Sequence, residues 1–80
     1  MMTLNKGDII KEVKSNSKKG FENTTANATL TYRVDRVNAR TYTLTCIEGY
    51  MKNSGCKLTK GFKEKSVDIY GTTTEYFKIS

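Results

Sequence analysis

Apolar and polar residues alternate strictly in two stretches near the middle of the chain. Residues 28–34 carry an apolar side chain at every second position, and residues 40–48 repeat the pattern with Tyr42, Leu44 and Cys46 on one side. Side chains of a β-strand point alternately to its two faces, so this period predicts strands with one buried face. We therefore expect an antiparallel hairpin over residues 28–48, with Cys46 pointing into the core.

The segment between these two strands is short and polar. Asn38 lies in it and tolerates the left-handed backbone that tight turns need. Asp35 and Arg36 interrupt the alternation just before it. An interruption of this kind predicts a β-bulge, in which one strand carries an extra residue.

The remaining elements are predicted from shorter patterns. We expect a first strand over residues 7–13, a long polar loop over 14–27 with Phe21 as an anchor, and a short strand over 56–59. The spacing of Phe62, Ser66 and Ile69 is near-helical and allows one short helical turn at 62–66, whereas Val67 and Ile69 alternate as in a strand over 66–70. A turn at 71–74 and a closing strand at 75–79 complete the chain.

The composition agrees with a β-protein. The chain has 80 residues, twelve of which are threonine and five tyrosine, and it contains no proline. β-Branched and aromatic side chains suit a pleated, half-buried surface. We predict one all-β domain over residues 1–80, a small antiparallel barrel or strongly bent sheet of five to six strands, in which pairing of the chain ends protects the edges.

This pattern resembles the Src-homology-3-like small-barrel superfold. The residues that carry the resemblance are Asn5-Lys6-Gly7-Asp8-Ile9-Ile10, Tyr32-Arg33-Val34-Asp35-Arg36-Val37 and Arg40-Thr41-Tyr42-Thr43-Leu44. The resemblance implies a barrel whose first loop is the long one after the first strand. The chain lacks a tryptophan and the acidic first loop of the members that bind proline-rich peptides, so we do not expect that activity.

The residue types argue against an enzyme or a cofactor protein. There is no histidine, which is the commonest general base, and the carboxylates are scattered singly. Two cysteines, Cys46 and Cys56, cannot close a zinc site by themselves, and we expect free thiols. No apolar run reaches the roughly 20 residues of a membrane-spanning helix, and the first residues do not resemble a secretion signal. We therefore expect a cytoplasmic protein without a cofactor.

Positive charge is concentrated in three segments. The formal net charge is +6, with +3 in residues 11–19, +2 in 33–40, +3 in 57–65 and −2 in the rest. If the fold merges these segments, the resulting patch would attract phosphates; otherwise the lysines serve solubility. Tyr50, Phe62 and Tyr70 are candidates for stacking on bases if they are exposed. The candidate binding residues are Lys11, Lys14, Lys18, Lys19, Arg33, Arg36, Arg40, Lys57, Lys60, Lys63, Lys65 and Tyr50.

Three functions agree with this sequence. The first is a non-enzymatic module that binds nucleic acid or a nucleoprotein. The second is a module that binds an acidic protein surface, because small basic β-domains look like proteins of phages and mobile elements, some of which inhibit host defence nucleases. The third is a structural or assembly subunit whose threonine-rich strands pair across a homodimer.

Overall fold

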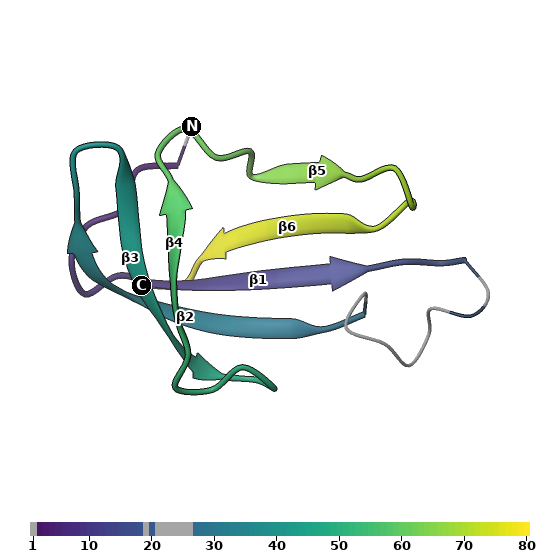
Figure 1. Ribbon diagram of the computed structural model, residues 1–80, viewed down its shortest axis with the longest axis horizontal. Coiled ribbons are helices and arrows are strands. Elements are labelled where there is room, and N and C mark those ends of the chain that lie inside the picture. The colour runs from purple at the N-terminus through teal and green to yellow at the C-terminus, as the bar shows by residue number, and fades with distance from the viewer. Residues whose placement is uncertain (1, 19, 21–26) are drawn as a thin grey trace.

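The computed structural model describes residues 2–18, 20 and 27–80, and all the regular structure in these residues is β-strand. Six strands follow one another along the chain: β1 (Ile9–Ser15), β2 (Thr29–Val37), β3 (Thr41–Glu48), β4 (Gly55–Thr59), β5 (Lys65–Val67) and β6 (Thr73–Lys78). Figure 1 shows them as one sheet.

The six strands form a curled antiparallel half-barrel. Their order in the sheet is β4-β3-β2-β1-β6-β5, so the first strand lies in the middle and pairs with the last. In Figure 1, β4 crosses the direction of β1 and β6 at a steep angle, which shows how strongly the sheet is bent. The all-β class and the antiparallel, strongly bent sheet predicted from the sequence are confirmed. The first and last strands pair, but this pairing does not protect the edges as predicted, because β4 and β5 lie at the two edges without a further strand partner among the described residues.

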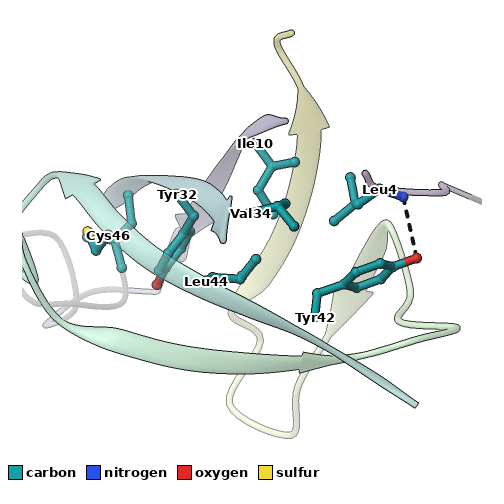
Figure 2. Close-up of a cluster of buried hydrophobic side chains, with 8 residues drawn as sticks. Leu4, Ile10, Tyr32, Val34, Tyr42, Leu44 and Cys46 are labelled. Carbon is teal, nitrogen blue, oxygen red and sulfur yellow. Dashed lines mark hydrogen bonds between the residues drawn. The ribbon is translucent and has the colours of Figure 1, made fainter. Parts of the chain in front are cut away.

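The core lies on the concave face of the half-barrel. The alternating residues of the two central strands that point inward are buried, and the side chain of Ile10 from β1 packs with them. Leu4, which precedes the first strand, is also buried, and its backbone N–H donates to the Tyr42 hydroxyl at 3.4 Å. Figure 2 shows this contact at one end of the cluster and Cys46 at the other. The inward position predicted for Cys46 is therefore confirmed.

The pairing of β2 with β3 is irregular where the sequence predicts a bulge. The register shifts between Val34 and Arg36, so that Val34 lies opposite Leu44 and Arg36 lies opposite Thr43. Asp35 is the extra residue. The predicted bulge is confirmed, and it increases the local twist that bends the sheet.

The polar segment after β1 is tied to the turn between β5 and β6. Asn16 is buried, and its side-chain amide donates to the Tyr70 carbonyl at 3.0 Å and to the Thr72 hydroxyl at 2.9 Å. The turn is also held by Asp68, whose carboxylate accepts from the backbone N–H groups of Tyr70 and Thr72. The two Asn16 bonds join segments that lie more than 50 residues apart in the sequence.

The helical turn predicted at residues 62–66 is wrong. The chain there makes a turn at 60–61 and then enters β5, and no helix occurs in the described residues. Phe62 explains the difference, because its ring packs edge-on between Tyr42 and Tyr76, with centroids at 6.4 and 5.1 Å. This contact holds the segment extended across the sheet, which a purely local spacing cannot indicate.

Several strand boundaries also differ from the expected ones. β1 continues through Lys14 and Ser15, which were expected in the loop, because they pair with Thr74 and Thr73. The strand expected at 66–70 ends at Val67, and β6 begins at Thr73 inside the expected turn. The predicted anchoring role of Phe21 lies outside the described residues. No helix in the described part of the chain has the length and apolar character needed to cross a bilayer.

Candidate nucleic-acid interface

Four cations project from the outer face of the sheet, on the side opposite the core. Residues that are register partners in an antiparallel pair point to the same face. Lys11 pairs with Thr31, Arg33 with Thr45, and Thr43 lies between Arg36 on β2 and Lys57 on β4. The strand neighbours of these cations, such as Ile10 beside Lys11 and Val34 beside Arg33, point into the core, so the cations themselves face outward. We call this set, Lys11, Arg33, Arg36 and Lys57, the basic strip.

The bulge in β2 determines which way Arg36 points. Without the extra residue, strict alternation from Arg33 would place Arg36 on the core side with Val34. The register shift at Asp35 instead sets Arg36 opposite Thr43, which is an outward position. Arg36 therefore joins the strip because of the bulge.

Arg33 is held in place by its neighbours. Its Nε donates to Asp35 Oδ1 at 2.8 Å, and the Thr45 hydroxyl donates to the other oxygen of the same carboxylate. The hydrogen bond from Thr45, and then the one from Arg33, lower the pKa of Asp35 below its usual value. Asp35 engages Arg33 through Nε, and the terminal guanidinium nitrogens can still reach a ligand, since the side chain is half exposed.

Lys11, Arg36 and Lys57 are free of ion pairs in the part of the chain that the structure describes. Besides Asp35, two carboxylates occupy outward positions in the described strands: Glu75 lies opposite Lys65, and Glu48 lies opposite Thr31 at the end of β3. Neither is a register partner of a strip cation. The three unpaired cations are thus available to an anionic ligand.

Threonine hydroxyls lie among the strip cations. The Asn38 side-chain amide donates to the hydroxyls of Thr41 and Thr43, at 3.0 and 2.9 Å. Because these hydroxyl oxygens accept from Asn38, their own O–H groups are left to donate. Thr43, which lies between Arg36 and Lys57, can therefore add a hydrogen bond to a phosphate that those cations hold.

Two further candidate cations lie at the end of the sheet next to the strip. The backbone N–H of Lys60 donates to the Arg40 carbonyl at 2.8 Å, which brings the two residues side by side. The Lys60 ammonium lies 5.6 Å from the centre of the Tyr42 ring, in a cation–π contact, and so points toward the core side. Lys60 is therefore engaged inside the molecule, and Arg40 is exposed at the turn.

The other candidates lie apart from the strip. Lys14 and Lys63 line the concave side, Lys65 pairs with Glu75 on the far edge, and the Lys18 side chain lies over Gly71. Tyr50 is exposed in the turn after β3, and Lys19 is outside the described residues. Each of the two lysine-rich segments, 11–19 and 57–65, is divided between different surfaces, so the fold merges the three basic segments only in part.

The concave face is hollowed on either side of Glu12 and Tyr76. Two hollows of about 370 and 260 Å³ share Glu12, Lys14, Leu58 and Tyr76 as lining residues. Lys57 also borders the smaller hollow, because it lies on the edge strand β4. The Tyr76 hydroxyl donates to Glu12 at 2.7 Å, and burial together with this carboxylate raises the pKa of Tyr76. Phe62, a stacking candidate from the sequence, is partly buried beside these hollows.

Cys56 lies at the same hollowed face, and Cys46 is buried behind it. Both thiols are free, as expected from the sequence. Cys56 is exposed as a residue, but partial desolvation of its thiol, followed by the negative charge of Glu12, raises the pKa of the thiol. A raised pKa keeps the thiol protonated and unreactive near neutral pH.

Phe77 is an outward-facing aromatic residue that was not among the candidates predicted from the sequence. This residue is 47% exposed and is the register partner of Lys11 across the β1–β6 pair, on the outer face. Its neighbour Tyr76 points the other way and packs against Phe62. The adjacent aromatic pair Tyr76-Phe77 in a predicted strand was a usable signal, because alternation requires one of the two to face outward.

Comparisons with protein-family models, curated proteins and solved structures found no match to this chain.

Proposed function

We propose that this protein is a non-enzymatic binding module that contacts the phosphate backbone of nucleic acid through the basic strip. The observation that carries the proposal is the gathering of Lys11, Arg33, Arg36 and Lys57 on one face, although they come from three strands. Three of them have no ion-pair partner among the described residues. Cations held in such a row release counterions when they neutralise phosphates, which favours binding.

The size of the strip suits a short length of nucleic acid. Neighbouring strands are about 4.8 Å apart, so β1 and β4, which are three spacings apart in the sheet, lie roughly 14 Å apart along its surface. One strand of a duplex carries a phosphate about every 3.4 Å of helix axis. The strip therefore spans about four phosphates, matching its four cations.

The test is the affinity for labelled single-stranded and duplex DNA and RNA, measured by fluorescence anisotropy at several salt concentrations. For four phosphate contacts we expect the logarithm of the association constant to fall with the logarithm of salt concentration with a slope of about −3 on single strands. That slope corresponds to an affinity roughly 50-fold weaker at 200 mM than at 50 mM salt.

Matched variants separate the strip from overall charge. The strip variant carries Lys11→Gln, Arg36→Gln and Lys57→Gln, and the control carries Lys6→Gln, Lys52→Gln and Lys63→Gln; both lower the formal net charge from +6 to +3. We expect the strip variant to lose most of its affinity and its salt slope to fall to about −1, with the control close to wild type. Equal losses in both variants, or no binding at low salt, would refute the proposal. The second result would direct the search to an acidic protein partner.

We also propose that the half-barrel is a variant of the Src-homology-3-like small barrel. Two features support this assignment: the long connection between β1 and β2, and the central hairpin formed by β2 and β3. Both agree with what the sequence resemblance implies. The assignment concerns fold only, and the functional proposal does not depend on it.

A further inference from the structure

Phe77 is an exposed aromatic ring at one end of the basic strip. It lies opposite Lys11, and Lys11 lies opposite Thr31, which is two residues from Arg33 on the same face of β2. Directly opposed side chains in an antiparallel pair have Cβ atoms about 5 Å apart, and diagonal neighbours are about 7–8 Å apart. The Lys11 ammonium therefore lies between the Phe77 ring, directly opposite it on β6, and the Arg33 guanidinium, which is its diagonal neighbour on β2.

Other apolar side chains lie near Phe77 on the outer face, together with the carboxylate of Glu75, two residues before it on β6. Ile79, two residues further on, is 55% exposed, and its backbone N–H donates to the Ile9 carbonyl, which brings it beside the first strand. Ile9 points outward next to Arg33. Large apolar side chains that are exposed together usually mark a contact surface. Here that surface adjoins cations. A nucleotide carries the two complementary groups, a flat base for the apolar surface and a phosphate for the cations.

We infer that the outer face selects single-stranded nucleic acid, with a base stacked on Phe77 and the adjoining phosphates bound by Lys11 and Arg33; this rests on the function proposed above. Bases of a duplex stack on one another and offer no free face to Phe77, whereas the bases of a single strand do. The convex curvature favours the same choice, because a duplex is stiff over about 150 base pairs and cannot follow a tightly curved sheet.

The direct test uses Phe77→Trp as a fluorescent reporter, which is clean because the chain contains no other tryptophan. We expect a single-stranded 12-mer to quench the tryptophan emission as it binds, and a 12-base-pair duplex to leave the emission unchanged. Emission that does not respond to the single strand, under conditions where anisotropy shows the strand bound, would overturn the inference.

Affinity measurements on three further variants complete the test. Phe77→Leu removes the ring and keeps an apolar side chain, and it should weaken single-strand binding by roughly 5- to 150-fold, the effect of one base stack. Phe77→Tyr should retain the affinity. Tyr70→Leu removes another exposed aromatic, located in the β5–β6 turn away from the strip, and should have no effect.

The possible failures can be told apart. If no nucleic acid binds the wild-type protein, the proposed function and this inference both fail. If binding depends on the strip and single strands and duplexes bind equally, or if Phe77→Leu weakens both to the same degree, only the preference for single strands is refuted.

Discussion

A single glycine determines how closely the turn after β3 approaches β2. Gly49 has φ of +117°, and a Cβ atom there would lie 2.5 Å from Leu30 Cδ2 and 2.9 Å from the Thr29 carbonyl oxygen. Gly49→Ala combines backbone strain with a clash against a buried side chain, and we expect it to lower the free energy of unfolding by about 3–5 kcal/mol. Urea denaturation followed by circular dichroism measures the change.

Gly61→Ala is the matched control. Its φ of +83° is also unfavourable for alanine, but a Cβ there would have no atom within 4 Å. The expected loss is the conformational cost alone, about 1–2 kcal/mol. Equal losses at the two positions would show that the contact between Gly49 and Leu30 is unimportant.

At the concave face, Glu12 should control the reactivity of Cys56. Its charge contributes to the raised pKa of the thiol, and only the thiolate reacts with alkylating agents. Glu12→Gln should therefore shift the pH dependence of Cys56 alkylation to lower pH. The rate of iodoacetamide labelling, followed by mass spectrometry across pH 7–10, tests this.

Glu75→Gln is a suitable control, since Glu75 lies on the outer face opposite Lys65. It removes the same charge and should leave the alkylation profile unchanged. A profile that does not move in Glu12→Gln would exclude the electrostatic effect of Glu12 on the thiol.

At the scale of elements, Asn16 connects the segment after β1 with the β5–β6 turn. Asn16→Ala removes both donors of a buried amide, and we expect a loss of about 1–3 kcal/mol in the free energy of unfolding. Because the bonds end on Tyr70 and Thr72, amide hydrogen exchange should accelerate at residues 68–72.

Asn38→Ala provides the comparison for this prediction. Asn38 also donates two side-chain hydrogen bonds, but they stay within one hairpin and are only partly buried. Its loss should cost less, about 0.5–1.5 kcal/mol, and should not affect exchange at 68–72. An equal effect of the two variants would mean that the long-range connection adds nothing.

The strands that could be predicted from sequence are those with a long alternating pattern. β2 and β3 span nine and eight residues, and each buries one face, so every second residue carries the signal. β5 has three exposed residues and no such pattern. The extended path of residues 62–66 depends on Phe62 packing against Tyr42 and Tyr76 from other strands, which is tertiary information.

The basic strip was only partly predictable for a related reason. Lys57 points outward because strand alternation places it between Cys56 and Leu58, which lie opposite the core residues Leu44 and Tyr42. Lys60 and Lys63 follow in an irregular segment whose direction no local rule sets. Charge density along the sequence therefore indicates how many cations are near one another, and strand register indicates which of them share a face.

At the scale of the whole molecule, acid should destabilise the fold. Protonation of all eight carboxylates would raise the formal side-chain charge from +6 to +14. Hydrogen bonds, chiefly from the Asn5 backbone to Asp8 and from the Thr45 hydroxyl to Asp35, lower the pKa of both residues in the folded state. Groups with a lowered folded pKa stabilise the protein above their unfolded pKa and lose that contribution as pH falls below about 4.

We therefore expect the thermal midpoint to drop between pH 4 and pH 2, and added salt to recover part of the loss by screening. Asp8→Asn with Asp35→Asn should lower the midpoint at pH 7 and flatten its fall in acid. A double variant whose midpoint falls as steeply as that of the wild type would rule out these two carboxylates as the cause.

The free edges of the half-barrel bear on how copies of the protein behave at high concentration. An unpaired edge strand is a template for a strand from another molecule, and lysines on it oppose such growth because the charges would have to approach one another. β4 carries Lys57 and β5 carries Lys65, so each exposed edge has such a charge. Lys57 would then have a second role beside the proposed phosphate binding, because its charge also opposes aggregation through the β4 edge. Replacing it with an apolar residue should therefore reduce colloidal stability as well as any affinity for nucleic acid.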